Sequence, residues 1–116
     1  MGRRSRREHR LTAQSSDYAD PEGNVLTLRA SLPAGARREY EQMLSDPSRP
    51  QEDAWQRAFE LLFERLAVRW VIAGLPIDRQ RELLARLRIA SPGERAWIRD
   101  ALREHSAEHF PELRAP

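Results

Sequence analysis

The chain has 116 residues, of which 40% are hydrophobic and 33% are charged, and its formal net charge at pH 7 is +2. This length suits a single domain, and the lack of cysteine excludes disulfides, thiolate metal sites and cysteine nucleophiles. No apolar run approaches the ~20 residues that span a bilayer, and no secretory signal pattern is present. We therefore expect a cytoplasmic protein with no membrane partner.

Residues 1–10 (MGRRSRREHR) carry more than the whole net positive charge of the chain. Five arginines against one glutamate give them +4, so the remaining residues carry −2. Their low apolar content predicts a disordered tail. The tail is either a solubilising end or a set of phosphate contacts with nucleic acid or another polyanion. The candidate polyanion contacts are Arg3, Arg4, Arg6, Arg7 and Arg10.

A strand or hairpin is predicted within residues 11–32. Leu26 and Leu28 in NVLTLRASL alternate with polar residues, which is the period of a half-buried strand. Pro21 and Gly23 in DPEGN are suited to a turn, so the preceding residues are candidates for a first arm. The pattern of that arm is weak, which leaves open a single strand that pairs with another chain or lies on helices.

Helical periodicity follows Pro33. It predicts four helices, at about 34–45, 50–74, 78–89 and 92–109. Ser48 with Gln51 fits a capping box at the start of the longest helix, and Gly74 with Pro76 fits its end.

Two further caps mark the last two helices. Asp78 is expected to cap the third, and Ser91 with Glu94 forms an S-x-x-E capping box before the fourth. The predicted fold is therefore mainly α: a four-helix compact domain over residues 11–116, with an N-terminal β-strand or β-hairpin and a disordered basic tail.

The string HSAEH matches the H-x-x-E-H signature of inverzincin peptidases. His105 and His109 share one helical face and could supply two zinc ligands. Catalysis would need a third ligand on another element, which the sequence does not indicate. Histidines in a last helical turn also interact favourably with the helix dipole. We therefore interpret the string as a helix end and predict no metal site.

No other catalytic motif is present. The sequence has no dinucleotide-binding, Walker A or nucleophile-elbow pattern, and its acidic residues mix with arginines as in solvated ion pairs. A helix-turn-helix over the last two helices would begin its recognition helix with Pro92, Gly93 and Glu94, and that acidic turn opposes a phosphate backbone. We expect a protein that is not an enzyme and has no cofactor.

Three segments together resemble the small tail assembly chaperones of long-tailed bacteriophages and prophages. They are VLTLRASLPAGARREYEQML, ERLAVRWVIAGLPID and LARLRIASPGERAWIRDALREH, within residues 25–106. The loop GLPIDRQ is shorter than in that pattern, and the arginine tail is not part of it. The resemblance implies a non-enzymatic, helical assembly factor that binds the tape-measure protein of the tail, or tail-tube subunits.

Such a chaperone needs an exposed apolar surface that covers helices of its client. The candidate partner residues are Leu26 and Leu28 on a strand edge, Trp97, and Phe110 after the last helix. A homo-oligomer stays open. The alternative function is a small nucleic-acid-associated regulator that uses the arginine tail.

Overall fold

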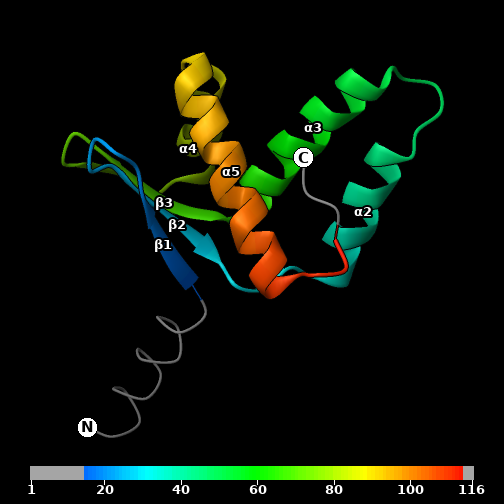
Figure 1. Ribbon diagram of the computed structural model, residues 1–116, viewed down its shortest axis with the longest axis horizontal. Helices are drawn as coiled ribbons and strands as arrows, with labels where there is room; N and C mark the ends of the chain where they lie inside the picture. The colour runs from blue at the N-terminus through cyan, green and yellow to red at the C-terminus, as the bar shows by residue number, and fades with distance from the viewer. Residues whose placement is uncertain (1–14, 114–116) are drawn as a thin grey trace, which may run out of the picture.

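The computed structural model describes residues 15–113 (Figure 1). The predicted basic tail lies outside these residues. The elements in chain order are β1 Ser15–Ala19, β2 Val25–Arg29, α2 Ala34–Leu44, α3 Gln51–Leu66, β3 Ala67–Ile72, β4 Leu75–Ile77, α4 Gln80–Arg88 and α5 Pro92–His109. None of the helices in this part of the chain is long and apolar enough to cross a membrane.

The expectation of a mainly helical domain with only a strand or hairpin is wrong. The described residues form a four-stranded antiparallel sheet, in the order β1-β2-β3-β4, beside the helices. Figure 1 shows the sheet on the left and the α2 and α3 pair extending to the right. The fold therefore combines a four-stranded sheet with helices, of which α2 and α3 extend away from the sheet.

The first hairpin has the predicted turn. Pro21 and Gly23 follow Asp20, whose carbonyl accepts from the Gly23 N–H at 3.0 Å, and Gly23 has a φ of 85°. The Asp20 carboxylate also accepts from the backbone N–H groups of Glu22 and Asn24. These bonds fix the turn, and β1 pairs with β2 from Ser15 opposite Arg29 to Ala19 opposite Val25. The hairpin alternative is thus the one observed.

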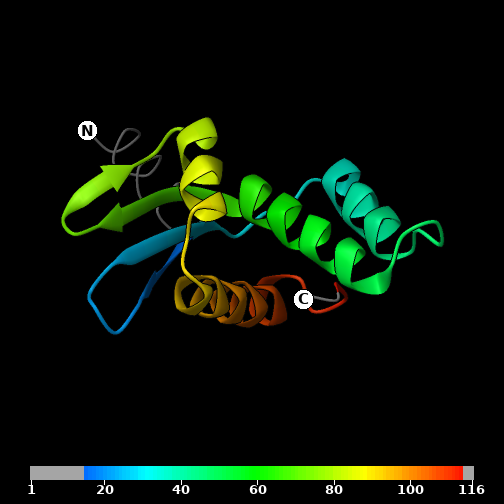
Figure 2. The same cartoon turned by 90° about the horizontal axis from the view of Figure 1, so that it is seen from above.

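The predicted helix over 50–74 is wrong over residues 67–74. Helix α3 ends at Leu66, and the chain continues directly into β3, as Figure 2 shows from above. Ala73 and Gly74 have φ values of 51° and 79° and connect β3 to β4. Positive φ at both central residues is typical of the type I′ hairpin turn. Gly74 is therefore a hairpin residue and not a helix cap.

Two residues explain why a strand forms at this place. Val71 and Ile72 are β-branched and lose side-chain freedom in a helix, whereas they pack well on a pleated surface. Trp70 lies opposite Leu26 in the register with β2, where both side chains are buried. Pairing with β2 thus overrides the helical periodicity of this stretch. Pro76 lies on β4, an edge strand, where proline is tolerated.

The core lies between the inner face of the sheet and the helices. Tyr18, Leu26, Trp70 and Ile77 form one row across the four strands and pack with the core. The largest fully buried hydrophobic side chains are Tyr40, Phe59, Phe63, Phe110, Leu26, Leu28, Leu62, Leu66, Leu87, Ile98 and Leu102. They come from β2, all four helices and the segment after α5, so all these elements share one core.

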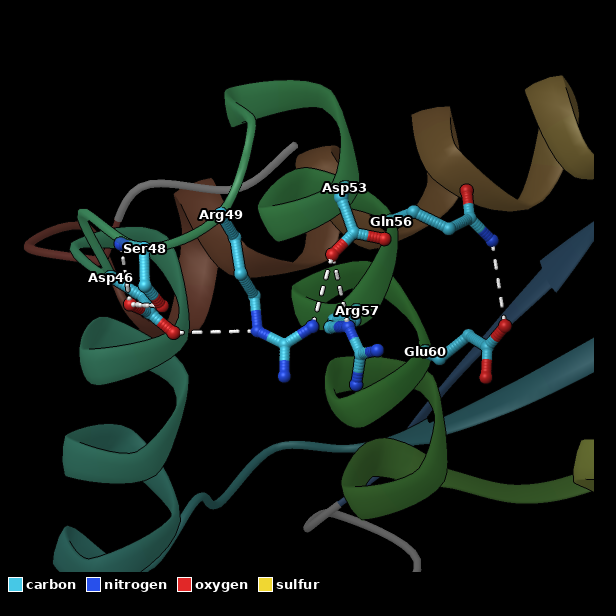
Figure 3. A network of polar contacts seen from close by, with 7 residues as sticks. All are labelled: Asp46, Ser48, Arg49, Asp53, Gln56, Arg57 and Glu60. Atoms are coloured by element: carbon cyan, nitrogen blue, oxygen red, sulfur yellow. Dashed lines mark hydrogen bonds and ion pairs between the residues drawn. The ribbon is translucent and has the colours of Figure 1, made fainter.

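The helical pair α2 and α3 is joined by a loop held by surface charges (Figure 3). Asp46 accepts from the backbone N–H and hydroxyl of Ser48, and Arg49 bridges Asp46 and Asp53 at 3.3 and 3.2 Å. The predicted capping box of Ser48 is wrong, because Pro50 is the N-cap of α3 and no side chain caps it. These exposed ion pairs contribute little stability but set the loop geometry.

The last two helices begin differently. Ser91 and Glu94 form the predicted capping box of α5, with both reciprocal hydrogen bonds present. The hydrogen bond from the Ser91 N–H, and also Arg86 at 2.6 Å, hold the pKa of Glu94 below its usual value. The predicted Asp78 cap is wrong, because Arg79 is the N-cap of α4 without a side-chain bond.

Substitution of Ala73 by asparagine tests the hairpin assignment. Asparagine adopts positive φ more easily than alanine, so Ala73→Asn should raise the free energy of unfolding by about 0.5 to 1 kcal/mol. In a helix the same change would lower it by roughly 0.6 kcal/mol. Urea unfolding of both proteins gives the sign, and a destabilised variant would contradict the type I′ turn.

Candidate partner surface

The predicted partner residues are mostly buried. Leu26 and Leu28 are 0% exposed on β2, an inner strand of the sheet, and Phe110 is 1% exposed. Trp97 is half-buried and packs against the core. Of these four side chains only Trp97 is partly accessible to a partner. The candidate polyanion contacts Arg3, Arg4, Arg6, Arg7 and Arg10 lie outside the described residues.

An apolar row instead crosses the outer face of the sheet. The strand register aligns Ala19 with Val25, Val25 with Val71, and Val71 with Pro76. Residues directly opposite each other in antiparallel strands point to the same face, and this row alternates with the buried row of Leu26 and Trp70. Ala19 and Pro76 are exposed and the two valines are half-buried. We call these four residues the outer row.

Polar side chains border the outer row along the strands. Asp17, Thr27 and Arg69 form the next row on the same face, and the Thr27 hydroxyl donates to the Asp17 carboxylate at 2.6 Å. An apolar strip beside a polar margin is the usual composition of a protein-binding patch.

The outer row is not found from the sequence because the pattern predicts a helix through residue 74 and a loop over 75–77. The signal was present in RWVIAGLPI, where β-branched and aromatic residues flank a two-residue Ala-Gly connection. That pattern is typical of a tight hairpin. The competing apolar stripe at helical spacing concealed it.

The two histidines of HSAEH lie over β1. Two strand residues span about 6.6 Å and four helical residues about 6 Å, so every fourth residue of α5 can meet every second residue of β1. His105 Nδ1 lies 2.8 Å from the Tyr18 hydroxyl, and His109 Nε2 lies 3.4 Å from the Ser16 hydroxyl. His105 Nε2 lies 2.5 Å from the Arg29 carbonyl oxygen. His105 therefore joins α5 to both strands of the first hairpin.

These contacts determine the protonation state of His105. A carbonyl oxygen only accepts, so Nε2 carries the proton and donates to Arg29. Nδ1 is then the acceptor for the Tyr18 hydroxyl. His105 is 0% exposed, and burial lowers its pKa, although the Arg29 carbonyl acts in the opposite direction. The neutral imidazole is thus part of the folded structure.

The same geometry bears on the zinc hypothesis. Both ring nitrogens of His105 already have hydrogen-bond partners, so metal binding would break one of these bonds. Within residues 15–113 no group of three or more histidine or acidic residues is placed to hold a metal ion. The arrangement is that of a structural histidine.

A hollow with a volume of about 640 Å³ lies between the starts of α2 and α4 and the α3–β3 junction. Its charged lining residues have both signs: Arg29, Arg65, Glu39, Glu64 and Asp78. Arg65 pairs with Glu39 at 3.3 Å, and the Gln80 amide donates to the Glu64 carbonyl. The hollow is open, and these two contacts link α3 to α2 and to α4 across it.

No protein-family model, no curated protein and no solved structure matches the chain.

Replacement of His105 tests its structural role. His105→Phe leaves the Arg29 carbonyl and Tyr18 hydroxyl without their partner, so stability at pH 7.5 should fall by about 2 to 4 kcal/mol. The lowered pKa means that the unfolded chain binds a proton more readily, so the histidine's contribution is complete above about pH 6.5 and declines below it. Urea unfolding should show that the difference in the free energy of unfolding between the wild type and His105→Phe becomes smaller from pH 7.5 to pH 5. A difference that does not change with pH would contradict the stabilising role of the neutral His105.

Proposed function

We propose that this protein is a non-enzymatic assembly factor, similar to a phage tail assembly chaperone, that binds an apolar helix of a client protein. The observation that carries the proposal is the outer row, Ala19, Val25, Val71 and Pro76, on the sheet face opposite the core. The segments that resemble tail assembly chaperones contain three of these four residues. The client is then a tape-measure-like or tail-tube protein.

The dimensions of the outer row suit a helix. Four strands about 4.8 Å apart make a row roughly 14 Å long. A helix rises 1.5 Å per residue, so about nine helical residues, or between two and three turns, could lie along it. Two or three apolar side chains on one helical face would then meet Val25 and Val71.

The shape of the surface also favours reversible binding. The outer row is narrow, and the polar row of Asp17, Thr27 and Arg69 limits its width. A small interface with a polar border is typical of transient complexes. An assembly chaperone has to release its client, so a modest surface suits that function.

Substitutions in the outer row test the client proposal. Val25→Thr combined with Val71→Thr keeps β-branched side chains and makes the row polar. It should weaken binding of a co-expressed tape-measure-like protein from the neighbouring gene about tenfold. Arg69→Thr, on the same face of β3, is the matched control and should leave binding nearly unchanged. Equal copurification of the double variant and the wild type, or no copurification of the wild type, would contradict the proposal.

A second candidate function rests on composition alone. Five arginines within residues 1–10 favour contacts with nucleic acid phosphates. Replacing all five by serine should reduce the slope of log K against log salt for duplex DNA by about 4.5. Fluorescence anisotropy over a salt series measures this slope. Undetectable DNA binding by the wild-type chain would exclude this function.

A further inference from the structure

The two edges of the sheet differ in their capacity to pair with another strand. Edge strand β4 has three residues, and Ile72 opposite Leu75 flanks its two-residue turn. Those two residues exchange hydrogen bonds in a type I′ hairpin, so the next residue, Pro76, directs its backbone nitrogen outwards. Proline has no N–H there. The centre of β4 therefore lacks the donor that a further strand needs.

Edge strand β1 has the outward backbone N–H and C=O groups that a further strand needs. The Asp20 N–H donates to the Asn24 carbonyl at 2.9 Å, which sets the alternation of hydrogen bonds in the first hairpin. Tyr18 then exchanges bonds with Leu26, while Asp17 and Ala19 direct their backbone N–H and C=O groups away from β2. Within residues 15–113 no strand pairs along this side of β1. Neither Asp17 nor Ala19 is buried.

Negative charge flanks this edge on both faces. The exposed Asp17 carboxylate lies on the outer face, held by the Thr27 hydroxyl. On the inner face, α5 lies over β1 through the contacts of His105 with Tyr18 and of His109 with Ser16, and Glu104 and Glu108 directly precede these two histidines on the helix. Both glutamates are exposed on α5. A strand beside β1 would thus meet carboxylates on either side.

We propose that the free edge of β1 binds an extended, basic segment of a partner protein as a fifth strand of the sheet. This interaction goes beyond helix binding by the outer row and uses different groups, the backbone of Asp17 and Ala19. Main-chain hydrogen bonds supply affinity in such strand addition, and alternate side chains supply specificity.

The strand register defines the preferred sequence of the partner. The residue opposite Ala19 extends the outer row and should be β-branched. The residue opposite Tyr18 lies on the inner face, on the side of α5 and its exposed Glu104 and Glu108, and the residue opposite Asp17 lies on the same face as the Asp17 carboxylate. Both positions favour arginine or lysine. In antiparallel order the partner motif is therefore one β-branched residue followed by two basic residues.

A synthetic strand tests this proposal with the full-length chain. The probe is the acetylated and amidated peptide TVRRVT, titrated while ¹H–¹⁵N NMR spectra are recorded. The backbone amide protons of Asp17 and Ala19 should shift downfield as they form hydrogen bonds. Ala19→Pro removes the outward N–H on an edge strand and should weaken binding by about tenfold or more, whereas Ala19→Ser, the matched control, should bind like the wild type.

Two control peptides test the charge preference and the main-chain hydrogen bonds separately. The peptide with glutamate in place of arginine, and the peptide with alternate N-methylated residues, should both bind at least about tenfold more weakly. If Ala19→Pro does not fold, Asp17→Asn provides the second variant and should weaken binding about threefold.

Four results would overturn the proposal. They are unshifted Asp17 and Ala19 amides, equal binding by Ala19→Pro, equal binding of the glutamate peptide, and slow exchange of both amides before peptide is added. The last result would mean that the chain itself or a second copy already occupies the edge. Loss of helix binding in the Val25→Thr and Val71→Thr double variant, with the peptide still bound, would separate this inference from the proposed function.

Discussion

The pairing of β2 with β3 is the constraint on which the rest of the structure depends. It joins two local hairpins into one sheet and places Leu26 opposite Trp70, inside the core. The same register places Val25 opposite Val71 on the other face. Because side chains alternate along a strand, a slip of one residue would bury the valines and expose Leu26 and Trp70. The core and the candidate partner surface are therefore fixed by one set of hydrogen bonds.

His105 ties the C-terminal helix to this sheet. It bonds to the side chain of Tyr18 on β1 and to the backbone of Arg29 on β2 while it is itself buried. α5 begins at a capping box that depends only on Ser91 and Glu94, so its start is local, whereas its placement depends on this long-range contact. The HSAEH string thus has a structural explanation that needs no metal.

Local signals predicted the local elements. The capping box of Ser91 and Glu94 predicts where the last helix begins, and the Pro21–Gly23 turn predicts the first hairpin. The helix prediction for residues 67–74 is wrong because their apolar side chains fit both a helix and a strand, and the choice depends on pairing with β2, roughly 40 residues away in the chain. A single sequence contains no information on such a partner strand. The outer row is missed for the same reason, since Val71 lies in that stretch and the pairing that aligns it with Val25 and Pro76 is not predicted.

The two proposed interactions use adjoining parts of the sheet. A helix would lie on the outer row and an extended segment beside β1, and Ala19 belongs to both surfaces.

We propose above all that the outer face of the sheet is the client-binding surface. Methyl NMR of the full-length chain tests it most directly, with Val25 and Val71 as reporters and the buried Leu28 as reference. On addition of a tape-measure-like client, we predict intermolecular NOEs to the valine methyls and none to Leu28. Valine signals that stay unchanged while the client binds would contradict the account.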